Sequence, residues 1–324
     1  MASNKIVSLK EAISTVQDGD IVYLGGIIDG RRPVGAMYEI ARQGKKNLIG
    51  LSFIAVEDIL VSAGCLRGVR GCYTHLGIFG KAPGVHRALA NNQLIIDEVG
   101  HVDAQLQLMA PAVGIPYVAS SYSIGSDIVN PHLDRSEELR AIARNKDKIP
   151  PRKYIFSKNP FSDKEEPVVL LPGIKPDIAI IHVGQVGTQG TCRIFGNPAL
   201  DQYAAFAADR VIITAEEVVS ESYLRRDPNR NYIPTNQVDL IVHLPWGAHP
   251  SLNPGYYDLD MEFLAKYQAV AKTEEGFAQW SQEWIYGVQD HNEYLSKLGV
   301  KKMQQLTAVK PFGFKPRSDI ELLV

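Results

Sequence analysis

Cysteine is scarce in this chain, and its charges of opposite sign nearly cancel. Only Cys65, Cys72 and Cys192 occur among 324 residues, which excludes a disulfide framework and favours reduced thiols in a cytoplasmic protein. The chain has 34 Lys and Arg and 36 Asp and Glu, which give a net charge of −2. The overall charge therefore does not favour nucleic acid or an anionic membrane as a partner. No apolar run approaches 18 residues, so we expect no membrane span. The N-terminus lacks the apolar core of a signal peptide.

Several familiar motifs are also missing. The sequence contains no G-x-x-x-x-G-K-[ST], no G-x-G-x-x-G after the first strand, no G-x-S-x-G and no H-E-x-x-H. Its 8 histidines are scattered, without a pair at a spacing typical of zinc sites. We therefore expect no metal, no nucleotide and no permanently bound cofactor.

Apolar runs that resemble strands alternate with amphipathic helical patterns through most of the chain. Several runs are continuously apolar, as in strands buried on both faces of a parallel sheet. Ser8 followed by Glu11 matches a capping box at one helix start. This alternation predicts an α/β fold: an open, mostly parallel sheet flanked by helices. The expected strands are 20–27, 48–55, 93–99, 116–120, 177–183, 210–214 and 238–244, and the expected helices are 8–17, 33–43, 102–113 and 200–208.

Two regions depart from this alternation. Residues 122–168 contain a charged helix at 135–148 and an exposed turn at 159–167, which predicts a small inserted subdomain. Residues 258–324 predict a helical C-terminal extension, with helices at 259–271, 273–286 and 289–298. The α/β core is then formed by residues 1–121 and 169–257.

The first candidate site ends a strand and opens a helix. Gly25 and Gly26 permit close approach of a ligand to the backbone, while Arg31, Arg32 and the amides of the helix start favour an anionic group. A tight strand-to-helix connection with solvated arginines explains the same pattern. Both interpretations stay open on the residues alone.

The second and third candidates are a histidine and a hydroxyl-rich loop. His101 follows an expected strand, where its imidazole could donate a hydrogen bond to an oxyanion or act as a general acid or base. It could instead merely cap the next helix. The loop that contains Ser121, Ser123, Gly125 and Ser126 could bind a carboxylate or phosphate, although Ser and Gly are also ordinary loop residues.

Two further motifs follow expected strands. Glu216 and Glu217 could include a nucleophilic carboxylate, but adjacent glutamates at such a place are more often a solvated helix start. His249 could line a cleft, and a structural hydrogen bond is its favoured role.

An ordered set of motifs resembles the α subunits of the glutaconate branch of the class I CoA-transferase family. The resemblance runs from about Leu9 to Gly299. It depends on the order and number of the motifs, since any one of them alone would be weak evidence for the family. They are Gly25-Gly26 with Arg32-Pro33, Asp177–His182, Gly190–Ile194, Glu216-Glu217, Arg225–Pro228, Gly247–Ser251 and Asp290–Gly299.

This resemblance implies a two-subunit enzyme that uses coenzyme A as a cosubstrate. Such α subunits pair with a homologous β subunit, in an αβ heterodimer or a higher assembly, and the active site lies between them. The β subunit supplies the nucleophilic glutamate in a Ser-Glu-Asn-Gly motif, which this chain lacks. That glutamate forms an acyl-glutamyl anhydride and then a glutamyl-CoA thioester, from which a second carboxylic acid takes the CoA.

The resemblance also assigns roles to individual positions. His101 stands where class I transferases commonly have a glutamine whose amide helps to form the oxyanion hole. The apolar residues Phe53 and Ala55 stand where relatives have small Gly- or Asn-containing loops, which predicts a bulkier or less polar acyl group than glutaconate. Thr74 and His75 follow the neighbouring strand and are expected to border the same pocket.

Two other functions fit the same fold. A histidine can transfer protons, which an amide does not readily do, so His101 also suits an acyl-CoA hydrolase, a ring-opening C–C hydrolase or a decarboxylase. In a related branch, the ring-opening hydrolases of steroid catabolism, this position resembles a catalytic glutamate. A noncatalytic acyl-CoA-binding subunit is the third possibility.

Overall fold

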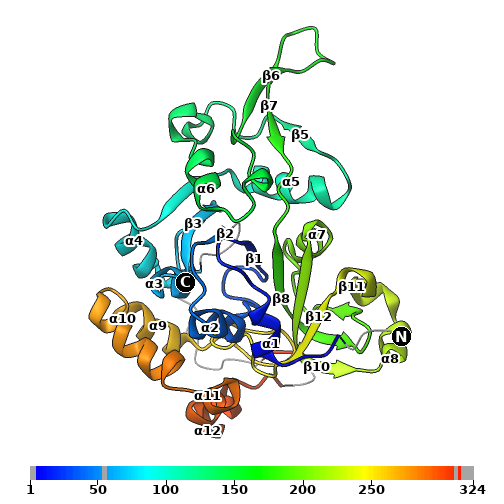
Figure 1. Ribbon diagram of the computed structural model, residues 1–324. Coiled ribbons are helices and arrows are strands. Elements are labelled where there is room, and N and C mark those ends of the chain that lie inside the picture. Colours follow the sequence, from blue (N-terminus) through cyan, green and yellow to red (C-terminus); the bar gives the residue numbers. More distant parts are fainter. Residues whose placement is uncertain (1–4, 53–56, 310–312, 315–324) are drawn as a thin grey trace, which may run out of the picture.

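A nine-stranded sheet forms the centre of the computed structural model, which describes residues 5–52, 57–309 and 313–314 (Figure 1). Its strands are β1 (Ile21–Leu24), β2 (Leu48–Ser52), β3 (Leu66–Gly71), β4 (Ile95–Glu98), β8 (Ile178–Gly187), β9 (Cys192–Arg193), β10 (Arg210–Val219), β11 (Asn231–Ile233) and β12 (Leu240–His243). The parallel strands follow the order β4-β3-β2-β1-β8-β10-β12. The short antiparallel strands β9 and β11 pair beside the end of β8.

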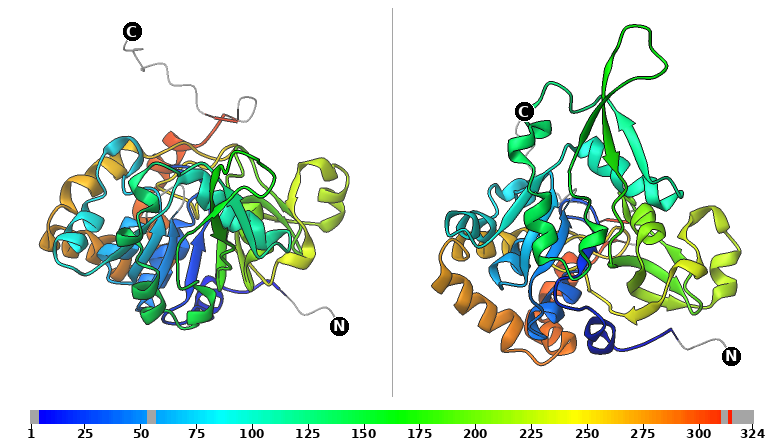
Figure 2. Two further views of the ribbon diagram at one scale, coloured as in Figure 1. Left: turned by 90° about the horizontal axis from the view of Figure 1, so that it is seen from above. Right: turned by 45° about the horizontal axis from the view of Figure 1, so that its top comes forward.

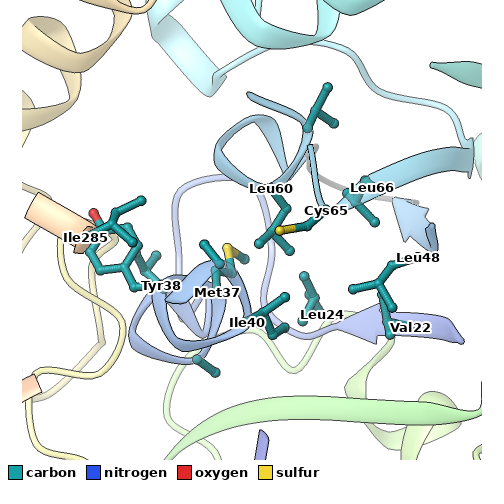
Figure 3. Packing of buried hydrophobic residues seen from close by; sticks show 14 of the residues in the cluster. Val22, Leu24, Met37, Tyr38, Ile40, Leu48, Leu60, Cys65, Leu66 and Ile285 are labelled. Atoms are coloured by element: carbon teal, nitrogen blue, oxygen red, sulfur yellow. The ribbon is translucent and has the colours of Figure 1, made fainter. Parts of the chain in front are cut away.

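Helices cover both faces of this sheet. Along β1, Val22 and Leu24 belong to one apolar cluster, whereas Ile21 and Tyr23 belong to another on the opposite face. Figure 3 shows part of the first cluster around Met37 and Leu60. The predicted open, mostly parallel α/β sheet flanked by helices is therefore confirmed. Helices α1 (Leu9–Ser14), α2 (Val34–Arg42), α3 (Asp58–Ser62) and α4 (Pro83–Ala90) contribute to the first cluster, and α5 (His101–Ala112), α6 (Ser136–Ile142) and α7 (Asp201–Ala207) to the second.

A second, three-stranded antiparallel sheet projects from the main body, at the top of Figure 1 and in the right view of Figure 2. It consists of β5 (Tyr117–Ser120), β6 (Ile155–Lys158) and β7 (Pro167–Pro172), in the order β5-β7-β6. The predicted turn joins β6 to β7 as the tip of a hairpin. Strand β6 is exposed at all its positions and is an edge of the sheet.

The structure corrects several expectations from the sequence. The single helix expected at 135–148 is wrong, because α6 ends at Ile142 and a separate 3₁₀ turn follows at Lys146–Lys148. The small sheet reaches from Tyr117 to Pro172, beyond both expected ends of the insertion, while α6 packs on the main sheet through Leu139. The sequence pattern does not predict β3, because two arginines interrupt its apolar run. The division into domains stays a prediction.

The helices expected near the C-terminus are confirmed, and they complete the first apolar cluster. Phe263 and Trp280 pack there with their rings 5.9 Å apart, edge to face. A π-helical turn at Gln282–Tyr286 extends the second of these helices. Within the described residues, no helix has the length and hydropathy needed to cross a bilayer. The expected helices are α9 (Met261–Val270), α10 (Glu274–Ser281) and α11 (His291–Leu298), and a further helix that the sequence did not predict follows as α12 (Val300–Leu306).

Candidate functional site

Four of the predicted site segments follow neighbouring parallel strands at one edge of the main sheet. The loop with Gly25 follows β1, the residues beyond Ser52 follow β2, Thr74 and His75 follow β3, and His101 follows β4. Open α/β sheets bind ligands at the carboxyl ends of such strands. Phe53 and Ala55, which are predicted to contact the acyl group, lie outside the described residues.

The two glycines after β1 are needed for close packing within the chain. A Cβ on Gly25 would lie 2.9 Å from Asp201 Oδ1 and 3.1 Å from the Cα of Ile181. Gly26 has a φ of +93°, and a Cβ there would clash with the carbonyl oxygen of Gly30. The chain's own atoms therefore occupy the space that the glycines leave on these sides.

Both arginines of this loop are buried and hold the loop in place. Arg31 forms an ion pair with Asp201 at 2.6 Å, and Asp201 Oδ1 also accepts hydrogen bonds from the Gly26 amide and the Tyr23 hydroxyl. Arg32 donates to the carbonyl oxygens of Leu24 and Gly25 and pairs with Glu57. The alternative of solvated arginines is wrong, because both side chains are buried. Substrate binding by Gly25, Gly26, Arg31 and Arg32 stays a prediction.

The structure brings the loop after β3 against the loop after β1. A Cβ on Gly77 would clash with the Asp29 carboxylate, so this carboxylate packs directly on the backbone beyond His75. His75 itself is exposed, with its ring 5.9 Å from that of Tyr73. Thr74 and His75 stand three and two residues before this contact, and their place at the acyl pocket stays a prediction.

His101 and the serine loop form a second group at the same end of the sheet. His101 is the exposed first residue of α5, after Gly100 in an extended conformation. A Cβ on Gly100 would lie 2.5 Å from Ser123 Oγ, so the loop packs directly against this helix start. Ser123 is buried and its carbonyl accepts a hydrogen bond from Ser126 Oγ at 2.7 Å. Ser121, Gly125 and Ser126 are exposed beside it.

A buried charge cluster that the sequence did not reveal lies at the end of β4, the strand that precedes His101 in the chain. Asp97, at the end of β4, accepts from Arg70 at 2.8 Å and lies 3.2 Å from Lys153 Nζ. Lys153 also donates to the carbonyl oxygen of Glu98 at 2.6 Å. The cluster ties β3, β4 and the small sheet's neighbouring segment together. Arg70 and Asp97 directly follow the apolar residues Val69 and Ile96, and a charge at such a strand position was the one signal for the cluster in the sequence.

Glu216 is neither a nucleophile in an open cleft nor part of a solvated helix start. It lies within β10, and its carboxylate accepts from His182, Asn253 and Tyr257 and from the Trp246 amide. Burial alone would raise the pKa of Glu216, but these hydrogen bonds lower it overall. With these partners Glu216 is a structural carboxylate. The structural role favoured for His249 is confirmed, because its ring bonds Tyr294 and Asp260.

His291 makes folding sensitive to acid. Burial lowers its pKa to about 4, against a smaller opposing effect of its hydrogen bond to the Pro245 carbonyl. Between pH 6.5 and 4 the unfolded chain therefore binds a proton there that the folded chain does not, so stability falls as the pH falls. Between pH 7 and 4.5 the free energy of unfolding should therefore fall by about 2–3 kcal/mol less in His291→Gln than in wild type.

Urea denaturation at both pH values measures this difference. His132→Gln, at an exposed histidine, is the matched control and should leave the pH dependence unchanged. An equal loss of stability in wild type and His291→Gln would contradict the assignment.

Comparison with known proteins gives one consistent result. A family model described as coenzyme A transferase matches residues 6–244. The chain is 36% identical to the A subunit of glutaconate CoA-transferase from Acidaminococcus fermentans, over 96% of this chain and 97% of that relative. It is 31% identical to the A subunit of 3-oxoadipate CoA-transferase from Pseudomonas knackmussii, over 92% of this chain and 99% of the relative.

Solved structures agree with these relatives. The crystal structure of glutaconate coenzyme A-transferase from Acidaminococcus fermentans superposes with a TM-score of 0.91 at 35% identity, covering 97% of this chain and 98% of that chain. The crystal structure of the decarboxylase AibA/AibB superposes with a TM-score of 0.68 at 28% identity, covering 86% of this chain and 99% of that chain.

Proposed function

The chain belongs to the coenzyme A transferase family, and we propose that it is the α subunit of a heteromeric enzyme that moves CoA between carboxylic acids. The observation that carries this proposal is the likeness to one subunit of a CoA-transferase over nearly the full length of both chains, at a TM-score of 0.91. Coenzyme A is then a cosubstrate and no other cofactor is required. The reduced thiols of Cys65, Cys72 and Cys192 agree with a cytoplasmic location.

The proposed chemistry is covalent and needs a nucleophile from a partner. The thioester carbonyl is attacked by a glutamate of a homologous β subunit, which releases CoA thiolate and leaves an acyl-glutamyl anhydride. The thiolate then attacks the glutamyl carbonyl, releasing the first acid and forming a glutamyl-CoA thioester. A second carboxylate repeats these steps in reverse order. Glu216 of this chain does not serve as the nucleophile, because it is buried and its oxygens are already hydrogen-bonded.

His101 supplies a hydrogen bond in this scheme. Its ring lies exposed at the start of α5, where an N–H can donate to the oxygen that becomes negative as the thioester carbonyl is attacked. Ser121, Gly125 and Ser126 lie beside it and suit contacts with the polar part of the substrate. In this chain alone these groups face solvent, whereas anhydride and thioester intermediates need a dry cleft. Cover by a β subunit meets that need.

The small sheet presents a surface that suits such a partner. Its neighbouring loop contains Ser121, so the surface continues from the candidate site. Strand β6 is an open edge, and Phe161 at the hairpin tip is 96% exposed. Exposed edges and large exposed apolar side chains are typical of interaction surfaces. Other exposed apolar residues on the same sheet and loop are Tyr117, Tyr122, Ile155 and Phe156.

A second candidate function is hydrolysis, C–C cleavage or decarboxylation of an acyl-CoA, with His101 as the acid or base. The likeness to the decarboxylase AibA/AibB, at 28% identity and a TM-score of 0.68, supports this second function. A noncatalytic acyl-CoA-binding subunit would bind the thioester without turnover.

The test compares the purified chain alone with the chain co-purified with its β subunit. Release of CoA from an acyl-CoA and formation of a second acyl-CoA are measured with and without an added acceptor acid. We expect transfer only from the complex and only with acceptor present. A full rate from this chain alone would contradict its assignment to a heteromeric enzyme. CoA release that does not depend on acceptor would favour the hydrolase or lyase.

A further inference from the structure

A small cavity lies beside the candidate site. It has a volume of about 70 Å³ and opens between the loops that follow β1 and β3 and the start of α3. Asp29 and Leu76 line it from these loops, and Asp58 lines it from the first turn of α3. Tyr267 and Trp280 close it from α9 and α10. A cavity of about 150 Å³ can hold benzene, so this volume suits about three or four carbon atoms.

The far wall of the cavity is rigid and apolar. Trp280 packs edge to face against Tyr267 at 4.8 Å and against Phe263 at 5.9 Å. Tyr267 is fixed further by a hydrogen bond from its hydroxyl to Asp58 at 2.6 Å. Such a wall favours an aliphatic group of definite shape.

The charged groups of the cavity do not suit an anion. Its lining contains three carboxylates, Asp29, Glu57 and Asp58, and one guanidinium, that of Arg32. Arg32 already pairs with Glu57 and donates to two carbonyl oxygens, so the one guanidinium on the described part of the lining is already balanced by a carboxylate. A second carboxylate on a substrate would meet repulsion here without a compensating ion pair.

The cavity lies at the same end of the sheet as the candidate site, because Arg32 and Leu76 line it from the loops after β1 and β3. Adjacent strands are about 4.8 Å apart, and β3, whose following loop provides Leu76, neighbours β4, which leads to His101. An acyl-CoA bound at this end of the sheet can therefore place a short acyl chain against Leu76 and the aromatic wall.

We propose that this cavity binds the acyl tail and selects a short, uncharged aliphatic acid in place of a dicarboxylic acid. The relatives are named for glutaconate and 3-oxoadipate, both of which are dicarboxylates. This inference rests on the proposed function as the α subunit of a CoA-transferase. Asp29 is the specificity-determining group, because it is half-buried at the cavity and the described contacts give its carboxylate no hydrogen-bonding partner.

The test measures acceptor selectivity of the assembled αβ complex. Isobutyrate and glutarate are compared as acceptors by kcat/KM, in wild type and in Asp29→Lys. We expect wild type to prefer isobutyrate by at least about tenfold, and Asp29→Lys to shift the ratio toward glutarate by a similar factor. Leu76→Trp, which fills the cavity, should reduce use of isobutyrate more than use of acetate.

Controls separate the possible outcomes. Glu275→Lys makes the same change of charge on the exposed surface of α10 and should leave the ratio unaltered. Circular dichroism of each variant checks that it folds. Asp29→Asn removes the charge of Asp29 but keeps its shape. Transfer with a preference for glutarate in wild type, or an unchanged ratio in Asp29→Lys, would overturn the cavity assignment. Absence of transfer to any acid would instead overturn the proposed function.

Discussion

Replacement of Asp201 by alanine is expected to lower the free energy of unfolding by about 3–5 kcal/mol. Asp201 is buried at the start of α7 and pairs with Arg31, which is 1% exposed. Its removal leaves a buried guanidinium without its counter-ion and leaves the Gly26 amide and the Tyr23 hydroxyl without their acceptor. Loss of one partner of a buried pair costs far more than the pair contributes relative to an apolar replacement.

Urea denaturation monitored by circular dichroism measures the loss. Asp201→Asn keeps an acceptor oxygen but not the charge, so it should fall between wild type and alanine. Glu138→Ala removes an exposed pair with Arg135 at 2.8 Å and should change stability by less than about 1 kcal/mol. If Asp201→Ala costs no more than this control, Arg31 does not depend on Asp201 and the buried-pair account of the loop is wrong.

Substitution of His101 should separate transfer from proton-transfer chemistry. In the assembled complex, His101→Ala removes a donor to the developing oxyanion and should reduce kcat for CoA transfer by about 10²–10³-fold. His101→Gln restores an N–H donor and should keep most of the activity. Because an amide does not act as a general acid or base, a hydrolase or decarboxylase would lose as much activity with glutamine as with alanine.

Because His101 is exposed, its substitution should change activity without destabilising the fold. Surface substitutions usually change stability by less than about 0.5 kcal/mol, so all variants should fold. Gln105→Ala, one turn further along α5 and also exposed, is the control for effects on the helix. Wild-type rates in His101→Ala would show that His101 neither contacts the reacting carbonyl nor transfers a proton in the reaction.

The sequence by itself determined the type and order of most elements. Apolar periodicity predicted the strands that begin near Ile21 and Ile178, and the Ser8–Glu11 capping box is formed as expected. These signals are local, because side-chain period and cap geometry involve residues within a few positions of one another. The ordered motifs also identified the family, which the comparisons confirm.

Which polar groups are free to act was decided by the tertiary structure. Arg31 meets Asp201 across 170 residues, and Glu216 meets Tyr257 across 41, so neither arginine nor carboxylate is the solvated group that local patterns suggested. Burial and pairing depend on which distant segments the fold brings together, and a short motif contains no information about them. The sequence therefore identified the end of the sheet where His101 and the serine loop lie. The tertiary structure showed which charged groups there are buried in structural pairs and which polar groups are exposed.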